Sequence, residues 1–322
     1  MAVGVGICAL IVASTIRYWR ERLVRQEIET MERRMGIGLF RVSDNRVYWV
    51  DVMGRSLEEK RQFIAKGTAI EGALSFDGTE IAFTYCAEPG LAHPTPYFTH
   101  CPAGHLHLGI VRVDGTSLKE YPNLAYPDIG CWSHDMSKLA LAVSDRTADR
   151  NAADSITVMT LAPGAMMKVA GMDNHVTSQC WSPDDKKLVY TENKVGGIQT
   201  VFVFDSENGQ SRALTSGLLA TWSPDGEWIS YLDQNDTYYV IRPDGSGKRR
   251  LFPGHGGVSE LSWSPDSQWV AYVSARRILE GALPSFETQP SRLRIRSVSK
   301  SSEAWVLNLS ATDNYWFQWA KL

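Results

Sequence analysis

Three copies of one pattern dominate the chain: CWSPDDKKLVY (Cys180–Tyr190), TWSPDGEWISY (Thr221–Tyr231) and SWSPDSQWVAY (Ser262–Tyr272). A looser copy, CWSHDMSKLAL, begins at Cys131, and a worn copy, LSFDGTEIAF, begins at Leu74. The aspartates of successive copies are 58, 49, 41 and 41 residues apart: Asp77, Asp135, Asp184, Asp225 and Asp266. A period of this length is typical of a four-stranded propeller blade that carries insertions.

The W-S-P-D segment predicts a turn between two strands. Proline fixes φ at the first corner, aspartate can accept hydrogen bonds from the backbone ahead of it, and glycine tolerates the unusual φ that follows. Alternating residues such as Trp228 and Tyr231 predict a half-buried strand after the turn. The tryptophan before the turn is bulky enough to fill the gap between neighbouring sheets. We therefore assign the repeated aspartates to the turns and not to a cation-binding ring.

A second repeated signal, an apolar strand that runs into a polar turn, occurs six times against five copies of the first. The six segments begin at Tyr48, Gly109, Val158, Val201, Tyr239 and Ile295. The C-terminal NYWFQWAKL resembles the strand that enters the motif, so it can join strands around 39–42, 47–52 and 62–64. Pairing the two termini removes exposed sheet edges. The sequence thus predicts an all-β, six-bladed β-propeller closed by its N- and C-terminal strands.

The copies resemble the WSPDG repeat of TolB-type six-bladed β-propellers, which also occurs in the propeller domains of prolyl-oligopeptidase-like enzymes. The resemblance covers residues 37–322, and three full W-S-P-D copies make it specific for the fold. It implies a scaffold, a binding platform or a substrate gate, without choosing among them. The chain departs from the repeat at His134, which replaces proline, and at three positions that replace glycine: Met136, Asp185 and Ser267.

The N-terminus is predicted to be a membrane anchor helix, residues 1–19. Ala2–Ile16 is uncharged and spans about 22 Å as a helix, against about 30 Å of hydrocarbon. The residues predicted at the membrane interface are Arg17, Tyr18, Trp19 and Arg20. Because the positive charges follow the apolar run, we expect the N-terminus outside and the propeller on the cytoplasmic side of a bacterial inner membrane. A signal sequence and a buried or interfacial helix are the alternatives.

Residues 20–36 continue the helical period and are predicted to form a charged stalk that precedes the propeller domain, residues 37–322. The stalk is either solvated or packed on a partner. The net charge of −3 gives no basic field for nucleic acid. The five cysteines are odd in number and widely spread, which predicts reduced thiols in a non-oxidising compartment.

The stretch HPTPYFTHCPAGHLHLG (His93–Gly109) holds four of the seven histidines. A structural zinc clip is one interpretation, with Cys101, His105, Cys86 and His100 as weak candidates, because C-x3-H spacing permits zinc without being diagnostic. The other interpretation is a stiff contact loop. This and a later long connection supply the candidate partner contacts: Pro96, Tyr97, Phe98, Arg276, Arg277 and Phe286. We expect the long connections on one face, opposite the point where the anchor joins.

No catalytic constellation stands out, and no G-x-S-x-G is present. The sequence favours a non-enzymatic, cofactor-free accessory or scaffold subunit of a larger integral-membrane complex, respiratory or photosynthetic, that contacts lipid and protein. The alternative is a TolB-like envelope module that binds or senses a protein or peptide at the propeller mouth. A metal-dependent hydrolase or lactonase is a third, weaker interpretation, since the histidines crowd into one unit.

Overall fold

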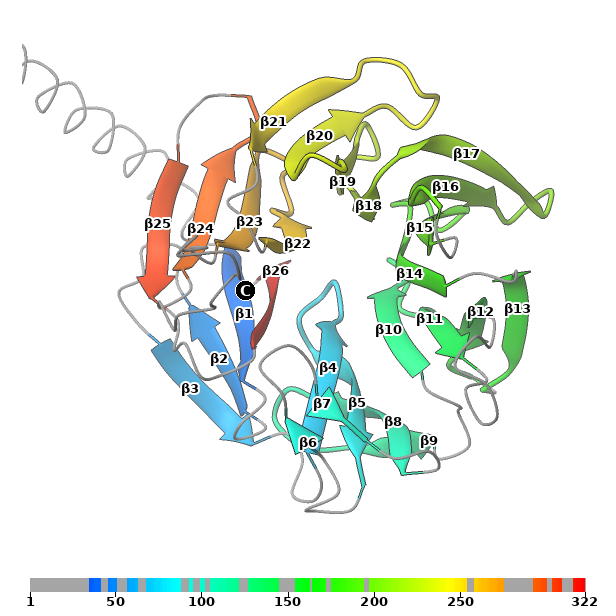
Figure 1. The fold of residues 1–322 in the computed structure, drawn as a ribbon. Coiled ribbons are helices and arrows are strands. Elements are labelled where there is room, and N and C mark those ends of the chain that lie inside the picture. The colour runs from blue at the N-terminus through cyan, green and yellow to red at the C-terminus, as the bar shows by residue number, and fades with distance from the viewer. Residues whose placement is uncertain are drawn as a thin grey trace, which may run out of the picture.

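The computed structural model describes residues 35–41, 46–50, 57–62, 68–87, 93–94, 99–101, 105–121, 127–144, 154–162, 164–171, 175–193, 197–253, 258–274, 292–299, 303–308 and 315–321. In these ranges the chain forms six four-stranded antiparallel sheets and one two-stranded ribbon. The sheets stand around a common centre as the blades of a propeller (Figure 1). The expectation of an all-β propeller is confirmed.

Each sheet is a meander whose first strand lies nearest the centre. In chain order the first two are β4 (Thr68–Leu74), β5 (Glu80–Cys86), β8 (Leu106–Arg112) and β9 (Lys119–Tyr121), then β10 (Pro127–Trp132), β11 (Lys138–Ser144), β12 (Asp154–Thr160) and β13 (Met166–Gly171). The next is β14 (His175–Trp181), β15 (Lys187–Asn193), β16 (Thr200–Asp205) and β17 (Gln210–Ser216). Two more follow: β18 (Leu218–Trp222), β19 (Ile229–Leu232), β20 (Thr237–Ile241) and β21 (Arg249–Pro253), then β22 (Val258–Trp263), β23 (Trp269–Ser274), β24 (Arg292–Ser297) and β25 (Glu303–Asn308).

The remaining sheet combines both ends of the described chain. Its order is β26 (Tyr315–Lys321), β1 (Met35–Arg41), β2 (Arg46–Val50) and β3 (Leu57–Gln62). β26 and β1 pair antiparallel from Met35 with Lys321 to Arg41 with Tyr315. Met35, which the sequence assigned to the helical stalk, therefore belongs to a strand, because ladder pairing with Lys321 takes precedence over the helical period.

The W-S-P-D segments are the turns between the first and second strands, as expected. In each, the serine hydroxyl donates to the aspartate of the same turn: Ser75–Asp77, Ser133–Asp135, Ser182–Asp184, Ser223–Asp225 and Ser264–Asp266, at 2.5–2.7 Å. The residue at the glycine position keeps a left-handed φ even where it is not glycine: Met136 (62°), Asp185 (55°) and Ser267 (59°). The aspartates thus hold turns, and the assignment made from the sequence is confirmed.

The core lies between successive sheets, where the motif tryptophans are wedged. Trp132 is 1% exposed and donates its indole N–H to the carbonyl of Ala73 in the preceding sheet, at 3.0 Å. Trp263 donates in the same direction to the hydroxyl of Ser230, also at 3.0 Å. Burying a side chain of this size removes more apolar area from water than any aliphatic residue would, so the tryptophan positions stabilise the contacts between sheets.

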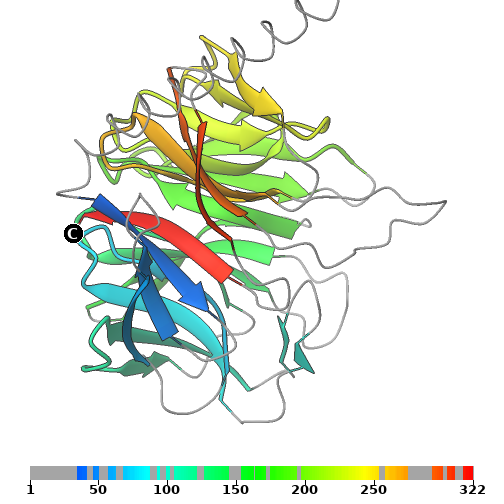
Figure 2. The same cartoon turned by 90° about the vertical axis from the view of Figure 1, so that its left-hand side faces the viewer.

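The two faces of the disc differ. The W-S-P-D turns lie at one end of the second strands, and the long connections leave from the other end, at Cys86, Ser144 and Ser274. Met35 pairs with Lys321 at the turn end of β26. The start of β1 and the ribbon of β6 (His93–Pro94) and β7 (Thr99–His100) lie on opposite sides of the disc in Figure 2. The second strands thus end on the side opposite the start of β1. The expectation that the long connections lie opposite the anchor remains a prediction, because the anchor and most residues of those connections lie outside the described residues.

No helix among the described residues is long and apolar enough to span a membrane. The predicted anchor (1–19) and its interface residues Arg17, Tyr18, Trp19 and Arg20 lie outside the described residues.

Candidate functional site

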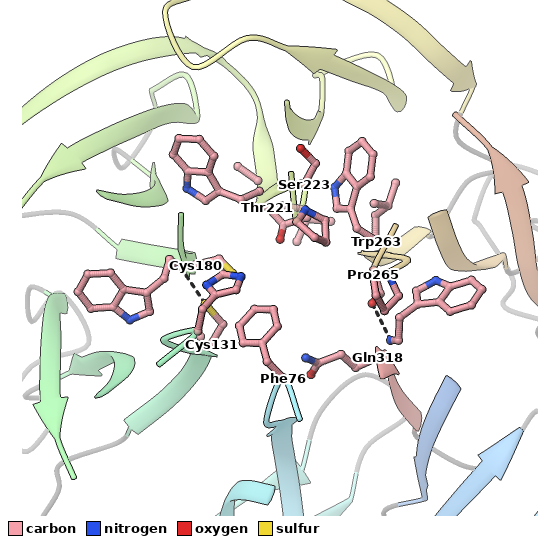
Figure 3. Close-up of a pocket in the computed structure, with 18 of the residues that line it drawn as sticks. Phe76, Cys131, Cys180, Thr221, Ser223, Trp263, Pro265 and Gln318 are labelled. Atoms are coloured by element: carbon pink, nitrogen blue, oxygen red, sulfur yellow. Dashed lines mark hydrogen bonds between the residues drawn. The ribbon is translucent and has the colours of Figure 1, made fainter. Parts of the chain in front are cut away.

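A cavity of about 470 Å³ occupies the centre of the ring at the turn face (Figure 3). The innermost strands and the W-S-P-D turns line it. Its wall consists of Phe76, Ile129, Gly130, Cys131, His134, Cys180, Trp181, Leu219, Ala220, Thr221, Trp222, Ser223, Pro224, Leu261, Ser262, Trp263, Pro265, Phe317, Gln318 and Trp319.

One position of the repeat, the residue before each tryptophan, supplies most of the polar side chains of this wall: Cys131, Cys180, Thr221, Ser262 and Gln318. Side chains alternate along a strand. Since Trp132 packs against the preceding sheet, Cys131 points the other way, towards the next sheet and the cavity that the inner strands line. The sequence analysis singled out the tryptophans and aspartates of the repeat. It did not single out the residue before each tryptophan, which lines the cavity.

The wall residues also tie successive sheets together. Cys131 Sγ accepts a hydrogen bond from the backbone N–H of Trp181, at 2.9 Å. Ser262 Oγ accepts from the N–H of Trp319, at 3.0 Å. A thiol and a hydroxyl therefore perform the same structural duty at equivalent places in the ring.

The inner strands are bulged where they line the cavity. The β10–β11 register shifts between Ile129 and Trp132, and the β18–β19 register shifts between Leu218 and Thr221. Leu219, inside the second bulge, has a φ of 54°, which is costly for a residue with a bulky side chain. Bulges of this kind re-aim side chains and interrupt ladder pairing, so backbone polar groups next to the cavity leave the regular hydrogen-bond pattern.

His134, which replaces the motif proline, stands at the rim. Its ring stacks on Phe76 with the centroids 3.7 Å apart. Asp185 of the next turn accepts from the backbone N–H groups of His134 (2.7 Å) and Asp135 (2.9 Å) and lies 3.3 Å from His134 Nδ1. Burial lowers the pKa of His134 despite the nearby carboxylate. Asp185, which stands where the repeat has glycine, thus binds the backbone of the preceding turn through its carboxylate.

The ionisable side chains of the described cavity wall are this histidine and the thiols of Cys131 and Cys180. None of the described residues that line it is Asp, Glu, Lys or Arg. Within the described ranges no group of three or more His, Cys, Asp or Glu is arranged to hold a metal ion. The wall offers hydroxyls, an amide, thiols and aromatic faces, which suit a neutral ligand that can both hydrogen-bond and pack.

The sequence prediction of reduced cysteines is wrong for Cys86 and Cys101, which form a disulfide with a Cα–Cα distance of 5.7 Å. β6 pairs with β7, His93 opposite His100, and this hairpin returns the chain to the end of β5. Spacing along the sequence does not show that return. The zinc clip of Cys101, His105, Cys86 and His100 is overturned with it, because the two sulfurs that would bind the metal are bonded to each other. Cys131 and Cys180 are not disulfide-bonded.

Pro96, Tyr97, Phe98, Arg276, Arg277 and Phe286 lie outside the described residues. His107 contacts Tyr85 edge-on, with ring centroids 5.5 Å apart.

Comparison with known proteins shows which fold the chain has, through solved structures of low sequence identity. The family model "WD domain, G-beta repeat" matches residues 247–276. Among curated proteins, none matches the chain. The structure is similar to a putative TolB from Agrobacterium tumefaciens (TM-score 0.60, 15% identity, covering 90% of this chain and 98% of that one). It is also similar to TolB from Acinetobacter baumannii (TM-score 0.63, 16% identity, 89% and 66%).

Enzymes share the same architecture. A puromycin-hydrolyzing peptidase of Mycobacterium tuberculosis matches with a TM-score of 0.56 at 14% identity, over 84% of this chain and 43% of the peptidase. The structural similarity establishes a TolB-like β-propeller fold. Identities this low leave open whether the chain is an enzyme.

Proposed function

We propose that this chain is a protein-binding propeller that holds an extended, uncharged segment of its partner in the central cavity at the turn face. The observation that carries the proposal is the uncharged wall of hydroxyls, thiols, amide and aromatic rings at the mouth of a rigid ring. Concave sites with a largely apolar lining and a few polar groups are typical ligand sites. The bulged inner strands add backbone groups that an extended peptide can pair with.

The lack of cationic side chains in the described wall favours a binding module over an enzyme that acts on acidic sugars. An oligogalacturonate lyase in complex with manganese shares the architecture, with a TM-score of 0.51. A polyanionic substrate requires cationic or metal partners, and the described cavity residues include neither Lys nor Arg. We therefore keep the chain in the class of binding modules, with absence of catalysis as a prediction.

We further propose that the ring is a complete six-bladed propeller and that a membrane tether formed by residues 1–19 leads into it. The pairing of β26 with β1 supports the closure. Since Met35 begins β1 at the turn face, a tether would leave from the same side as the cavity. The role of accessory subunit in a larger membrane complex depends on residues 1–36 and remains a prediction.

The Cys86–Cys101 disulfide indicates in which cellular compartment the propeller lies. Disulfides persist in oxidising environments such as the bacterial periplasm, so this bond favours an exported propeller of the TolB-like envelope type. It argues against the cytoplasmic placement drawn from the arginines after residue 16. Alkylation of intact cells with a membrane-impermeant maleimide, before and after reduction, tests this: labelling of Cys86 or Cys101 only after reduction from outside supports export.

The binding proposal is tested with peptides selected from a displayed random library on the full chain. The selected peptides are titrated against Thr221→Trp, which fills the cavity, and against Glu207→Trp on an exposed outer turn. We expect at least about a tenfold loss of affinity in the first, roughly 1.4 kcal/mol, and about none in the second. Equal affinity in both variants contradicts the proposal.

A further inference from the structure

Two cysteines that are not joined in a disulfide lie together in the cavity wall. Cys131 ends the inner strand β10, and Cys180 holds the equivalent place in β14 of the next sheet. Cys131 Sγ lies 2.9 Å from the backbone nitrogen of Trp181, the residue that directly follows Cys180. Figure 3 shows both sulfurs at one side of the cavity.

Structural duty alone does not require a thiol at either position. The equivalent positions of other sheets hold Thr221, Ser262 and Gln318. Ser262 accepts a backbone N–H from the next sheet as Cys131 does, at 3.0 Å against 2.9 Å. Serine would therefore serve at residue 131. Two thiols at adjacent places in the ring are a distinct chemical feature of this wall.

Both residues are partly exposed and line a cavity of about 470 Å³ that a small reagent can enter. The chain also holds a disulfide elsewhere, between Cys86 and Cys101. That bond lies within one sheet unit and joins the end of β5 to the β6–β7 hairpin. A bond between residues 131 and 180 would instead join two sheets at the centre of the ring.

We propose that Cys131 and Cys180 are a redox-active dithiol that closes to a disulfide between neighbouring blades in the wall of the central cavity. The oxidant is a small-molecule disulfide. One cysteine loses its proton to solvent and attacks the reagent, which releases one thiolate and leaves a mixed disulfide. The second cysteine, also deprotonated, attacks the protein sulfur of that mixed disulfide and releases the other thiolate. Two protein thiols are oxidised, and one reagent disulfide is reduced to two thiols.

The surroundings predict slow exchange at neutral pH. Burial raises the pKa of Cys131, and the neighbouring Cys180 and the carboxylate of Asp185 act in the same direction, while the N–H of Trp181 opposes them. Only the thiolate attacks a disulfide. The reaction is therefore run at about pH 8.5, the ordinary pKa of a cysteine thiol.

The test uses the full chain with Cys8→Ser, so that 131 and 180 are the remaining thiols. It is incubated with oxidised glutathione and then alkylated, and its intact mass and cross-linked peptides are measured. We expect both thiols to be lost together and a peptide that joins residues 131 and 180. Cys131→Ser and Cys180→Ser should each give at most one glutathione adduct and no internal bond.

A second, smaller probe covers the case in which oxidised glutathione is too large to reach the two thiols. Phenylarsine oxide bridges two thiols that lie within reach of each other, with release of water, and is much smaller than glutathione. One equivalent should bind the Cys8→Ser chain, and binding should weaken at least tenfold in either single serine variant. Two independent glutathione adducts, or arsenical binding that is equal in the single variants, would overturn the proposal. Absence of the joining peptide under excess oxidised glutathione would also overturn it.

Discussion

The side-chain amide of Gln318 bonds both backbone groups of Leu74, although 244 residues separate them. Oε1 accepts the N–H of Leu74 at 3.0 Å, and Nε2 donates to its carbonyl, also at 3.0 Å. This pair joins β26 to β4, the seam between the sheet built from both termini and the first motif sheet. At this seam one side chain thus makes the two backbone hydrogen bonds that a neighbouring strand would otherwise make.

Removing this side chain should loosen the seam. Gln318→Ala leaves two backbone groups of Leu74, which is fully buried, without partners, and we expect a loss of about 1–3 kcal/mol in the free energy of unfolding. Urea denaturation of the full chain measures it. Gln210→Ala, on the exposed outer strand β17, is the matched control and should change stability by less than about 0.5 kcal/mol. Equal effects would show that the seam does not depend on Gln318.

Gly109 lies directly against the ring of Phe83 on the neighbouring strand. A Cβ added at residue 109 would stand 2.5 Å from Phe83 Cζ, and Phe83 is fully buried. We expect Gly109→Ala to destabilise the protein by about 1–3 kcal/mol through overpacking. The same substitution in a Phe83→Leu background should cost clearly less, which a thermal double-mutant cycle measures. A cost that is unchanged in that background would rule out the clash as the cause.

Asp185 has a measurable role between turns. Asp185→Ala removes the acceptor of two backbone N–H groups, those of His134 and Asp135, and should cost about 1–3 kcal/mol. Asp185→Gly is the control, because glycine adopts the φ of 55° without strain and also lacks the acceptor. If Asp185→Gly keeps the stability of the unmodified chain in urea while Asp185→Ala loses it, the backbone conformation and not the bonding explains the effect.

Asp135 should make the turn sensitive to acid. Hydrogen bonds from the Ser133 hydroxyl and from Ser137 lower its pKa to about 2. The unfolded value is about 3.9, so its contribution is present above about pH 4 and is lost as the pH falls towards 2. Carboxyl NMR titration should find Asp135 near 2 in the native chain and higher in Ser133→Ala. Asp135→Asn should reduce the slope of unfolding free energy between pH 4 and 2, and an unchanged slope would contradict the assignment.

The sequence predicted the propeller because its turn motif is local. Proline, aspartate and a left-handed position act within a few residues, so the motif survives even where Met136 replaces glycine. Strand limits without the motif were less accurate: the outer strand expected at 62–64 is β3, Leu57–Gln62, since pairing with β2 and not local pattern sets its register.

The site was harder to predict because it depends on contacts between distant segments. The residues of the wall are ordinary in type. Only the arrangement of the inner strands around the ring shows that Thr221 and Gln318, each directly before a tryptophan, line one cavity. Cys86 and Cys101 could not be paired from spacing, because the β6–β7 hairpin brings them together. The histidine-rich stretch that drew attention as a metal site belongs to the opposite, loop-bearing side of the disc.

Hydrogen–deuterium exchange of the full chain with and without a selected peptide tests the central claim, that the cavity binds a partner segment, most directly. The account predicts slower exchange at the bulged inner-strand amides of separate sheets at once, Gly130 in β10 and Leu219 and Ala220 in β18, with the outer strands β13 and β17 unchanged. Protection confined to outer strands or to the ribbon β6–β7, with those inner amides unchanged, would contradict it.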